Sequence, residues 1–277
     1  MASTTDHGHA GGESIELMGL SIDRLDDEHL LDEMFDAMHR RSDDRRGDDR
    51  RGRGGWVVTV DVDVLRRQAA DPELRALYGA ADLRVAAGMQ LLWASRVQGQ
   101  PLPSRIAGTA LALRIASRAA DEGRSIVLVG GDPGAAEGAE AMLHRRYPGL
   151  DVRGICPGRV SLPASDDELD ALAEAIASPR VPDVVLLAYG SPKQEYVARG
   201  LRERVGEAWL VGVGPGLGLL AGQIHDAPPW MHELGVDWIH RLAKSPRRLA
   251  KRYLVDDLPF AARMFASAAV ARISRRR

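Results

Sequence analysis

Residues 182–195 read PDVVLLAYGSPKQE, and this stretch decides the fold class. The apolar run VVLLA has the length and the Val and Leu content of a strand that is buried on both faces of a sheet. Gly190 then permits a tight turn. Ser191, Pro192 and Gln194 stand where a helix prefers its N-cap, its first residue and its capping-box partner. A buried strand that turns directly into a helix is the repeating unit of parallel α/β sheets.

The same unit recurs along the 277-residue chain. Short apolar runs predict further strands at residues 56–60, 83–86, 125–129, 152–155 and 209–213. Stretches with helical periodicity predict helices at residues 88–98, 109–121, 134–147, 166–177 and 192–205. Strands separated by roughly 10–15 helical residues indicate βαβ crossovers. We therefore predict an α/β fold whose mostly parallel sheet carries helices on both faces.

The two ends of the chain and one internal stretch differ from this pattern. Residues 1–14 are polar, which is typical of a disordered lead. Residues 40–55, RRSDDRRGDDRRGRGG, follow a predicted helix at 28–39 and hold no apolar residue, so we predict a solvated loop. Residues 241–277 carry eleven Lys or Arg against two Asp, a net charge of +9, whereas the whole chain carries −2. We therefore divide the chain into a lead (1–14), a domain (15–240) and a basic helical tail (241–277).

The composition and the absence of certain motifs exclude several classes of function. A mean hydropathy of −0.21 and the lack of an apolar run of about 20 residues argue against a spanning helix or a secretory signal, so we expect a cytoplasmic protein. The lone Cys156 cannot form an internal disulfide. His225, His232 and His240 lack an H-E-x-x-H motif or a cysteine cluster, so we predict no metal site. Hydrolases and P-loop enzymes are disfavoured because the chain has neither a nucleophile elbow nor a P-loop.

The loops beyond the carboxyl ends of the strands are the candidate sites, because ligands of parallel sheets bind there. Gly130 and Gly131 follow one predicted strand, and they allow either a simple turn or the close approach of a ligand. Gly214 follows another, but Leu217 occupies the third glycine position of the dinucleotide fingerprint, which disfavours an NAD-dependent enzyme. In the opening motif, a well-formed helix start and a phosphate bound at the helix N-terminus beside Lys193 are both consistent with the residues.

Two acids follow the predicted strand at 56–60. Asp61 and Asp63 form a D-x-D pattern, which in some glycosyltransferases holds a divalent metal and a sugar nucleotide. An N-cap role in the helix predicted at 62–68 explains the same residues. In strand periodicity Thr59 shares a face with both acids, so it joins them as a candidate. The sequence leaves both interpretations open.

The tail interleaves bulky apolar and basic residues, as in WIHRLAKSPRRLAKRYL at 238–254. This pattern suits a helix that lies on an anionic membrane or closes over a polyphosphate. An ordinary amphipathic helix with a solvated basic face explains it as well. The charge of +9 leads us to favour the membrane or phosphate role. Aromatic residues make up only 5% of the chain and form no stacking platform, so we do not expect nucleic-acid binding.

Several segments in order resemble the WecG/TagA/CpsF family of bacterial glycosyltransferases. The likeness covers roughly residues 15–253 and rests on VVTVDVDVL (57–65), ADLRVAAGMQLLWASRVQGQPLPSRIAG (81–108), LVGGDPGAAEGAEAMLHRRYPGL (128–150), PDVVLLAYGSPKQE (182–195), and GVGPGLGLLAG with APPWMHELGVDWIHRL (within 212–242). The resemblance implies a Rossmann-like fold and an inverting hexosyltransferase. It implies transfer of a hexose, of the N-acetylmannosamine type, from a UDP-sugar to a polyprenyl-pyrophosphate-linked saccharide in cell-surface polysaccharide synthesis.

The resemblance also implies site residues and partners. Arg105 would lie beside the reacting sugar or phosphates. Arg241, Arg248 and Arg252 of the tail would close the site, across a subunit boundary if the protein forms a homo-oligomer. With the glycine turns added, the residues expected to bind the donor and its phosphates are Gly130, Gly131, Gly190, Ser191, Pro192, Lys193, Gln194, Glu195 and Gly214. The expected partners are the UDP-sugar, the lipid-linked acceptor and the anionic inner face of the cell membrane, and no cofactor is expected because the UDP-sugar is a substrate.

The sequence departs from the family pattern at its expected general base. Family members usually carry Asn at the position of Asp61, Pro-Asp-Gly at the positions of residues 86–88, and Asp at the positions of Ala110 and Gly218. Ala87 therefore replaces the favoured base, and an alanine cannot take the acceptor's proton. We hypothesise that Asp61 takes over this role, with Thr59 and Arg105 as the other catalytic candidates. The alternative is an inactive homologue that binds nucleotide-sugar or scaffolds polysaccharide assembly.

Overall fold

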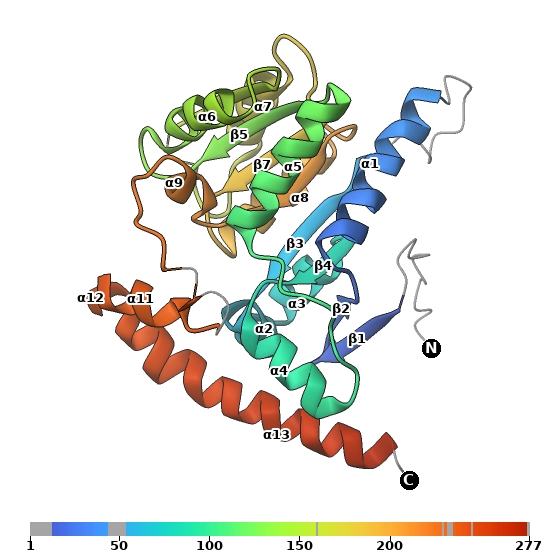
Figure 1. Cartoon of the computed structure of the whole chain (residues 1–277), viewed down its shortest axis with the longest axis vertical. Helices are drawn as coiled ribbons and strands as arrows, with labels where there is room; N and C mark the ends of the chain where they lie inside the picture. Colours follow the sequence, from blue (N-terminus) through green and yellow to red (C-terminus); the bar gives the residue numbers. More distant parts are fainter. Residues whose placement is uncertain are drawn as a thin grey trace.

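The computed structural model describes residues 13–43, 54–158, 160–228, 230–231, 235–244 and 246–275 (Figure 1). Most of the predicted lead and residues 44–53 of the predicted charged loop lie outside the described residues. The described chain forms a six-stranded, all-parallel sheet with helices on both faces, and a helical C-terminal segment extends beside it. The predicted α/β fold class is therefore confirmed.

The sheet has the strand order β4-β3-β8-β7-β5-β6. The chain builds β3 and then β4 at one edge, crosses to β5 and β6 at the other, and returns to fill the centre with β7 and β8. In register, Leu186 of β7 pairs with Leu128 of β5 and with Val211 of β8. All six strands lie within one residue of the predicted positions, and their bounds are β3 (Trp56–Val60), β4 (Leu83–Ala86), β5 (Ser125–Gly130), β6 (Asp151–Ile155), β7 (Val184–Ala188) and β8 (Trp209–Gly212).

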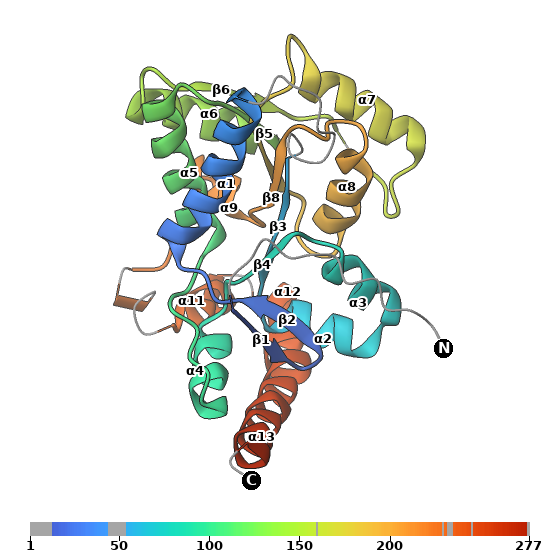
Figure 2. The same cartoon turned by 90° about the vertical axis from the view of Figure 1, so that its right-hand side faces the viewer.

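Two hydrophobic cores cover the two faces of the sheet. Figure 2 shows helices on either side of the strands. Because side chains alternate along a strand, Val58 and Val60 of β3 face one core and Val57 faces the other. The first core includes residues of α2 (Val62–Ala70), α3 (Pro72–Gly79), α4 (Met89–Gln98), α7 (Asp166–Ala177) and α8 (Lys193–Arg202). The second core includes residues of α1 (Asp27–Asp43), α5 (Gly108–Glu122), α6 (Ala135–Arg146) and α9 (Gly216–Leu220). Continuous apolar runs are therefore required in the central strands.

Three local features differ from the sequence prediction. Helix α1 continues to Asp43, so residues 40–43 are helical and do not belong to a loop. A short antiparallel hairpin of β1 (Ser14–Leu17) and β2 (Leu20–Asp23) precedes α1, and α3 follows α2. The buried Arg84 ties the hairpin to β4, since its backbone N–H donates to Asp23 (2.7 Å) and its Nε donates to the carbonyl of Ser21 (2.8 Å).

The C-terminal segment consists of α11 (Asp237–Lys244), α12 (Pro246–Ala250), the π-helical η1 (Lys251–Asp257) and α13 (Leu258–Arg275). It therefore begins four residues before the predicted tail. Helix α13 packs along α4 of the same chain (Figure 1). Its Phe260 and Met264 are buried in the first core. Among the described residues, no helix combines the length and the apolar composition that crossing a bilayer requires.

Candidate active site

The turns that follow β3, β7 and β8 meet at the centre of the sheet's carboxyl edge. Thr59 at the end of β3 donates its hydroxyl to the carbonyl of Gly212 at the end of β8 (2.9 Å). Gln194 of α8 lies across the end of β8, where its Oε1 accepts the N–H of Gly214 (3.1 Å). Gly212 leaves space for this side chain, since a Cβ there would lie 2.7 Å from Gln194 Nε2. Three predicted site residues, Thr59, Gln194 and Gly214, are thus brought together.

Asp61 lies at the same edge, beside the loop that follows β4. Its Oδ1 accepts the N–H of Val64 (2.9 Å), so it is the N-cap of α2. The N–H groups of Ala87 and Gly88 both donate to the carbonyl of Val60, at 2.8 and 3.3 Å. The loop of Ala87 therefore adjoins Asp61, as expected for neighbouring parallel strands. The Asp61 side chain remains 45% exposed, so it is accessible to a ligand.

Arg252 of η1 brings a positive charge to this carboxylate. Its Nη2 lies 3.2 Å from Asp61 Oδ2 and 3.3 Å from Asp63 Oδ2, and its Nε lies 3.4 Å from Asp257. Asp63 is buried and also pairs with Arg66 and with Arg67 (2.8 Å for the latter). The tail thus places Arg252 at its own chain's site, and this contact requires no second subunit.

Arg105 connects the loop after β4 to the tail. Its Nε donates to the carbonyl of Ala87 (3.0 Å), and its two terminal nitrogens contact the two carboxylate oxygens of Asp237 in α11 (3.1 and 3.2 Å). Arg241, another predicted site residue, lies 3.5 Å from the same carboxylate. Asp237 was not singled out in the sequence, because a lone acid in an amphipathic helix has no local signature. Arg248 belongs to α12, but its side chain lies outside the described part of the structure.

The start of α8 differs from the predicted capping box. The helix begins at Lys193 with Pro192 at the N-cap, and no described side chain caps its first turn. The Ser191 hydroxyl instead forms a hydrogen bond with the hydroxyl of Tyr78 in α3 (3.0 Å). Lys193 Nζ lies 5.3 Å from the centroid of the Tyr189 ring. The prediction of Ser191 as N-cap was therefore wrong, and the backbone N–H groups of this turn remain without a side-chain cap.

The comparison with protein families accounts for nearly the whole chain. Residues 15–274 match the model described as the glycosyl transferase WecG/TagA/CpsF family. The chain belongs to this family. The match extends through α13, so the tail that delivers Arg252 is part of the family's sequence pattern. Family membership implies a glycosyltransferase, and in this glycosyltransferase Ala87 occupies the loop between Asp61 and Arg105.

Glu195 is a predicted site residue whose acid chemistry the sequence did not reveal. It lies in the first turn of α8 and is only 1% exposed. Its Oε1 accepts a hydrogen bond from Gln194 Nε2 (2.9 Å), whereas Oε2 has no hydrogen-bond partner among the described residues. Burial raises the pKa of Glu195 to about 7, and the charge of Asp61 adds to this effect. Only the fold buries Glu195, so its sequence position carries no such signal.

The glycine turn after β5 lies farther along the same edge. Gly130 and Gly131 have left-handed φ angles of +86° and +87°. A Cβ at Gly130 would lie 2.9 Å from the Tyr189 ring, and the N–H of Gly131 donates to the carbonyl of Ala188 (3.0 Å). Turn geometry and packing therefore account for both glycines. Gly190 is also left-handed, with φ of +73°, and a Cβ there would meet nothing within 4 Å.

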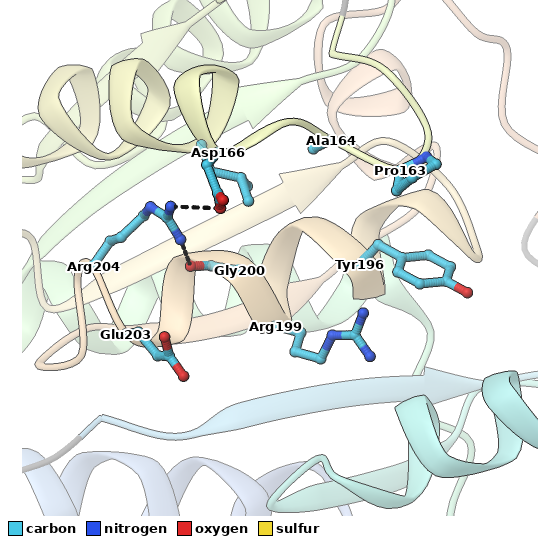
Figure 3. A pocket seen from close by; sticks show the side chains of 9 residues that line it. Pro163, Ala164, Asp166, Tyr196, Arg199, Gly200, Glu203 and Arg204 are labelled. Carbon is cyan, nitrogen blue, oxygen red and sulfur yellow. Dashed lines mark hydrogen bonds and ion pairs between the residues drawn. The ribbon is translucent and has the colours of Figure 1, made fainter.

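A pocket of about 350 Å³ lies elsewhere, between α7 and α8 (Figure 3). Arg204 contributes to its wall and is itself held by the carbonyl of Gly200 and by Asp166, both at 3.0 Å. As far as the structure describes it, the lining contains none of the predicted site residues. This pocket is therefore separate from the candidate active site.

Proposed function

We propose that this glycosyltransferase transfers a hexose, of the N-acetylmannosamine type, from a UDP-sugar to a polyprenyl-pyrophosphate-linked saccharide during cell-surface polysaccharide synthesis. The observation that carries the proposal is the placement of the Asp61 carboxylate between the loop of Ala87 and the guanidinium of Arg252. A proton acceptor and a phosphate-binding cation thus share one position at the edge of a parallel sheet, where such folds bind nucleotides.

In this proposal the donor diphosphate lies between the uncapped start of α8 and the arginines of the opposite side. The positive end of the α8 dipole and the ammonium of Lys193 favour an anion there, although the N–H groups of Gln194 and Glu195 already donate to backbone carbonyls. Arg105 and Arg252 supply charge-assisted hydrogen bonds that stabilise UDP as it leaves. Gly190 and Gly214 keep the turns free of side chains there.

Asp61 acts as the general base in an inverting step. The acceptor hydroxyl attacks the anomeric carbon on the side opposite UDP, the bond from that carbon to the phosphate oxygen breaks, and the hydroxyl proton passes to Asp61. Asp61 Oδ2 becomes free for this proton when Arg252 turns from the carboxylate to the donor phosphates. A positioned base contributes about 10² to 10⁴ in rate.

The tail holds the protein at the inner face of the cell membrane, where the acceptor is. Helix α13 buries one face against α4, yet Leu258, Val270 and Ile273 are each more than half exposed. Exposed Arg263 and Arg272 flank these apolar residues. A helix that presents both apolar and basic groups to solvent suits an anionic bilayer surface. The site then takes up its lipid-linked acceptor from the membrane.

The test is turnover by wild type and by Asp61→Ala. A screen of UDP-sugars for a rise in melting temperature identifies the donor, since a ligand that binds only the native state stabilises it. With that donor and a polyprenyl-pyrophosphate saccharide, wild type releases UDP. Asp61→Ala loses on the order of 100-fold or more of this rate and keeps the thermal shift with the donor. An unaffected rate in Asp61→Ala would rule out Asp61 as the base.

A second candidate function is favoured by one observation, the alanine at position 87. A non-catalytic homologue that binds nucleotide-sugar or scaffolds polysaccharide assembly would need no acid there. It would show the same thermal shift with a UDP-sugar but no UDP release with any lipid-linked acceptor. The same two measurements therefore separate the two functions.

A further inference from the structure

Asp237 is a buried acid of the C-terminal segment that the proposed transfer step does not use. It is the first residue of α11, and its side chain is 11% exposed. Its two carboxylate oxygens lie 3.1 and 3.2 Å from the two terminal nitrogens of Arg105, which makes the contact bidentate. The Arg105 side chain is 13% exposed, so the pair lies largely out of water. Asp237 thus fixes the plane of a guanidinium that comes from the segment between α4 and α5.

The same carboxylate also holds an arginine of its own helix. Arg241 lies four residues after Asp237 in α11, and its Nη2 is 3.5 Å from Asp237 Oδ2. Because Nη2 of Arg105 contacts the same oxygen, the two guanidinium groups are close neighbours. Two such cations repel each other unless an anion lies between them. Asp237 therefore allows one arginine from before α5 and one from α11 to occupy adjacent positions.

This pair of arginines adjoins the candidate active site. Nε of Arg105 donates to the carbonyl of Ala87 (3.0 Å), and the N–H of Ala87 donates to the carbonyl of Val60 (2.8 Å). Val60 ends β3 and directly precedes Asp61, so these contacts place Arg105 at the carboxyl edge of the sheet. A guanidinium carries several N–H donors in a planar fork, so one arginine can bind a carboxylate and a phosphate at the same time.

The backbone before α11 is shaped to bring Asp237 to this place. Gly235 is buried and left-handed, with φ of +68°. A Cβ at this position would overlap the side chain of Met89 in α4, so the chain can pass this close to α4 only because residue 235 is glycine. Stability does not explain the charges of the Asp237–Arg105 pair, because apolar residues of similar volume often stabilise a fold as well as a buried ion pair does. The charges therefore point to a role at the site.

We propose that Asp237 is a positioning residue of the donor site, which holds Arg105 and Arg241 in the orientation that binds the diphosphate of the UDP-sugar. This inference rests on the proposed function, because it takes the diphosphate as the ligand of Arg105. The carboxylate acts through the two arginines and does not touch the reacting atoms. Docking of α11 then completes the phosphate site, so binding of the donor depends on the C-terminal segment.

The direction of the change in UDP affinity distinguishes positioning from simple electrostatics. Asp237→Asn removes a negative charge beside the arginines, and Coulomb attraction alone would then make the anion UDP bind more tightly. The amide oxygen of asparagine can still accept from one terminal nitrogen of Arg105, but the amide N–H₂ opposes the other because both groups are donors. The bidentate contact is lost, the arginines lose their shared orientation, and UDP binds more weakly.

The experiment is isothermal titration calorimetry of UDP with the full chain. We expect Asp237→Asn to raise the Kd for UDP on the order of tenfold. In the Arg105→Gln background the same substitution raises Kd by about threefold or less, because the main group through which Asp237 acts is absent. Asp256→Asn is the matched control, since it removes the same charge from η1, and it keeps Kd within about twofold of wild type.

The outcomes separate this inference from the function on which it rests. If wild type binds UDP but Asp237→Asn binds it equally or more tightly, the positioning role is wrong and the proposed function stands. An undiminished effect of Asp237→Asn in the Arg105→Gln background also overturns the role.

A second variant decides the matter if Asp237→Asn does not fold. Arg105→Lys keeps the charge but lacks the planar fork, so we expect its Kd for UDP to rise on the order of tenfold. A wild-type Kd in Arg105→Lys would show that the orientation of the guanidinium is not needed, and it would overturn the inference. If wild type binds neither UDP nor any UDP-sugar, both proposals fail together.

Discussion

We predict that Glu195→Gln removes a pH dependence of the free energy of unfolding, whether or not the protein is active. The pKa of Glu195 rises from 4.5 to about 7 on folding because the carboxyl group is buried. Below pH 4.5 both the folded and the unfolded protein hold the proton, so the shift has no effect. Between pH 4.5 and 7 the unfolded chain releases the proton while the folded chain keeps it, so the free energy of unfolding falls as pH rises. Well above pH 7 the shift lowers the free energy of unfolding by about 3 kcal/mol.

The glutamine variant removes this pH dependence. Its amide is neutral at every pH, and its carbonyl still accepts from Gln194. The new amide N–H₂ takes the place of an oxygen that has no partner, which carries a penalty of about 1–3 kcal/mol that is the same at pH 5 and pH 8. We therefore expect the difference in unfolding free energy, variant minus wild type, to be more favourable at pH 8 than at pH 5 by about 2–3 kcal/mol.

Urea unfolding at the two pH values measures this difference, provided that the m-value is unchanged. Glu203→Gln is the control, since an exposed carboxyl is expected to change stability by less than about 0.5 kcal/mol at either pH. If wild type and Glu195→Gln lose the same stability between pH 5 and pH 8, the pKa of Glu195 is not raised by folding, and its burial does not govern its charge.

Two further predictions concern the turn at the sheet edge and the tail. In Gly212→Ala the new Cβ lies 2.7 Å from Gln194. We therefore expect urea unfolding to show a free energy of unfolding lower by about 1–3 kcal/mol, and the donor to raise the melting temperature less than in wild type. Gly149→Ala is the control and should change neither quantity, because a Cβ there meets nothing within 4 Å. Leu258→Asp places a charge on an exposed apolar position of α13, so sedimentation with phosphatidylserine vesicles should fall by roughly tenfold or more with an unchanged melting temperature. Leu162→Asp, equally exposed but outside the tail, should leave sedimentation unaltered, and a similar loss in both variants would contradict a membrane role for α13.

The structure gives a physical reason why Asp61 could serve in place of an acid at position 87, as we propose. Neighbouring parallel strands place the ends of β3 and β4 side by side, so an acid after either strand lies at the same edge. Arg105 contacts the loop of Ala87 through a backbone carbonyl, and this contact does not depend on the side chain at position 87. The position of Arg105 is therefore compatible with an acid on either loop.

The sequence by itself determined the sheet. Runs of four to six apolar residues can be buried on both faces only in a parallel sheet with helices on each side, and this requirement is local enough to be read from the pattern. It also determined that the candidate residues follow the strands, because chain order fixes which loop follows which strand. It was less informative where a charged run is compatible with two states. Residues 40–43 continue α1, since Arg is a good helix former.

Only the tertiary structure decided the contacts of these residues. Arg252 meets Asp61 across 191 positions of sequence, and Arg105 meets Asp237 across 132. Ser191 bonds to Tyr78 rather than capping its own helix, because α3 brings a hydroxyl close to it. The pKa of Glu195 is raised because the folded chain buries its carboxyl group. Pairing and burial are properties of the folded chain, and no local pattern of residues specifies them.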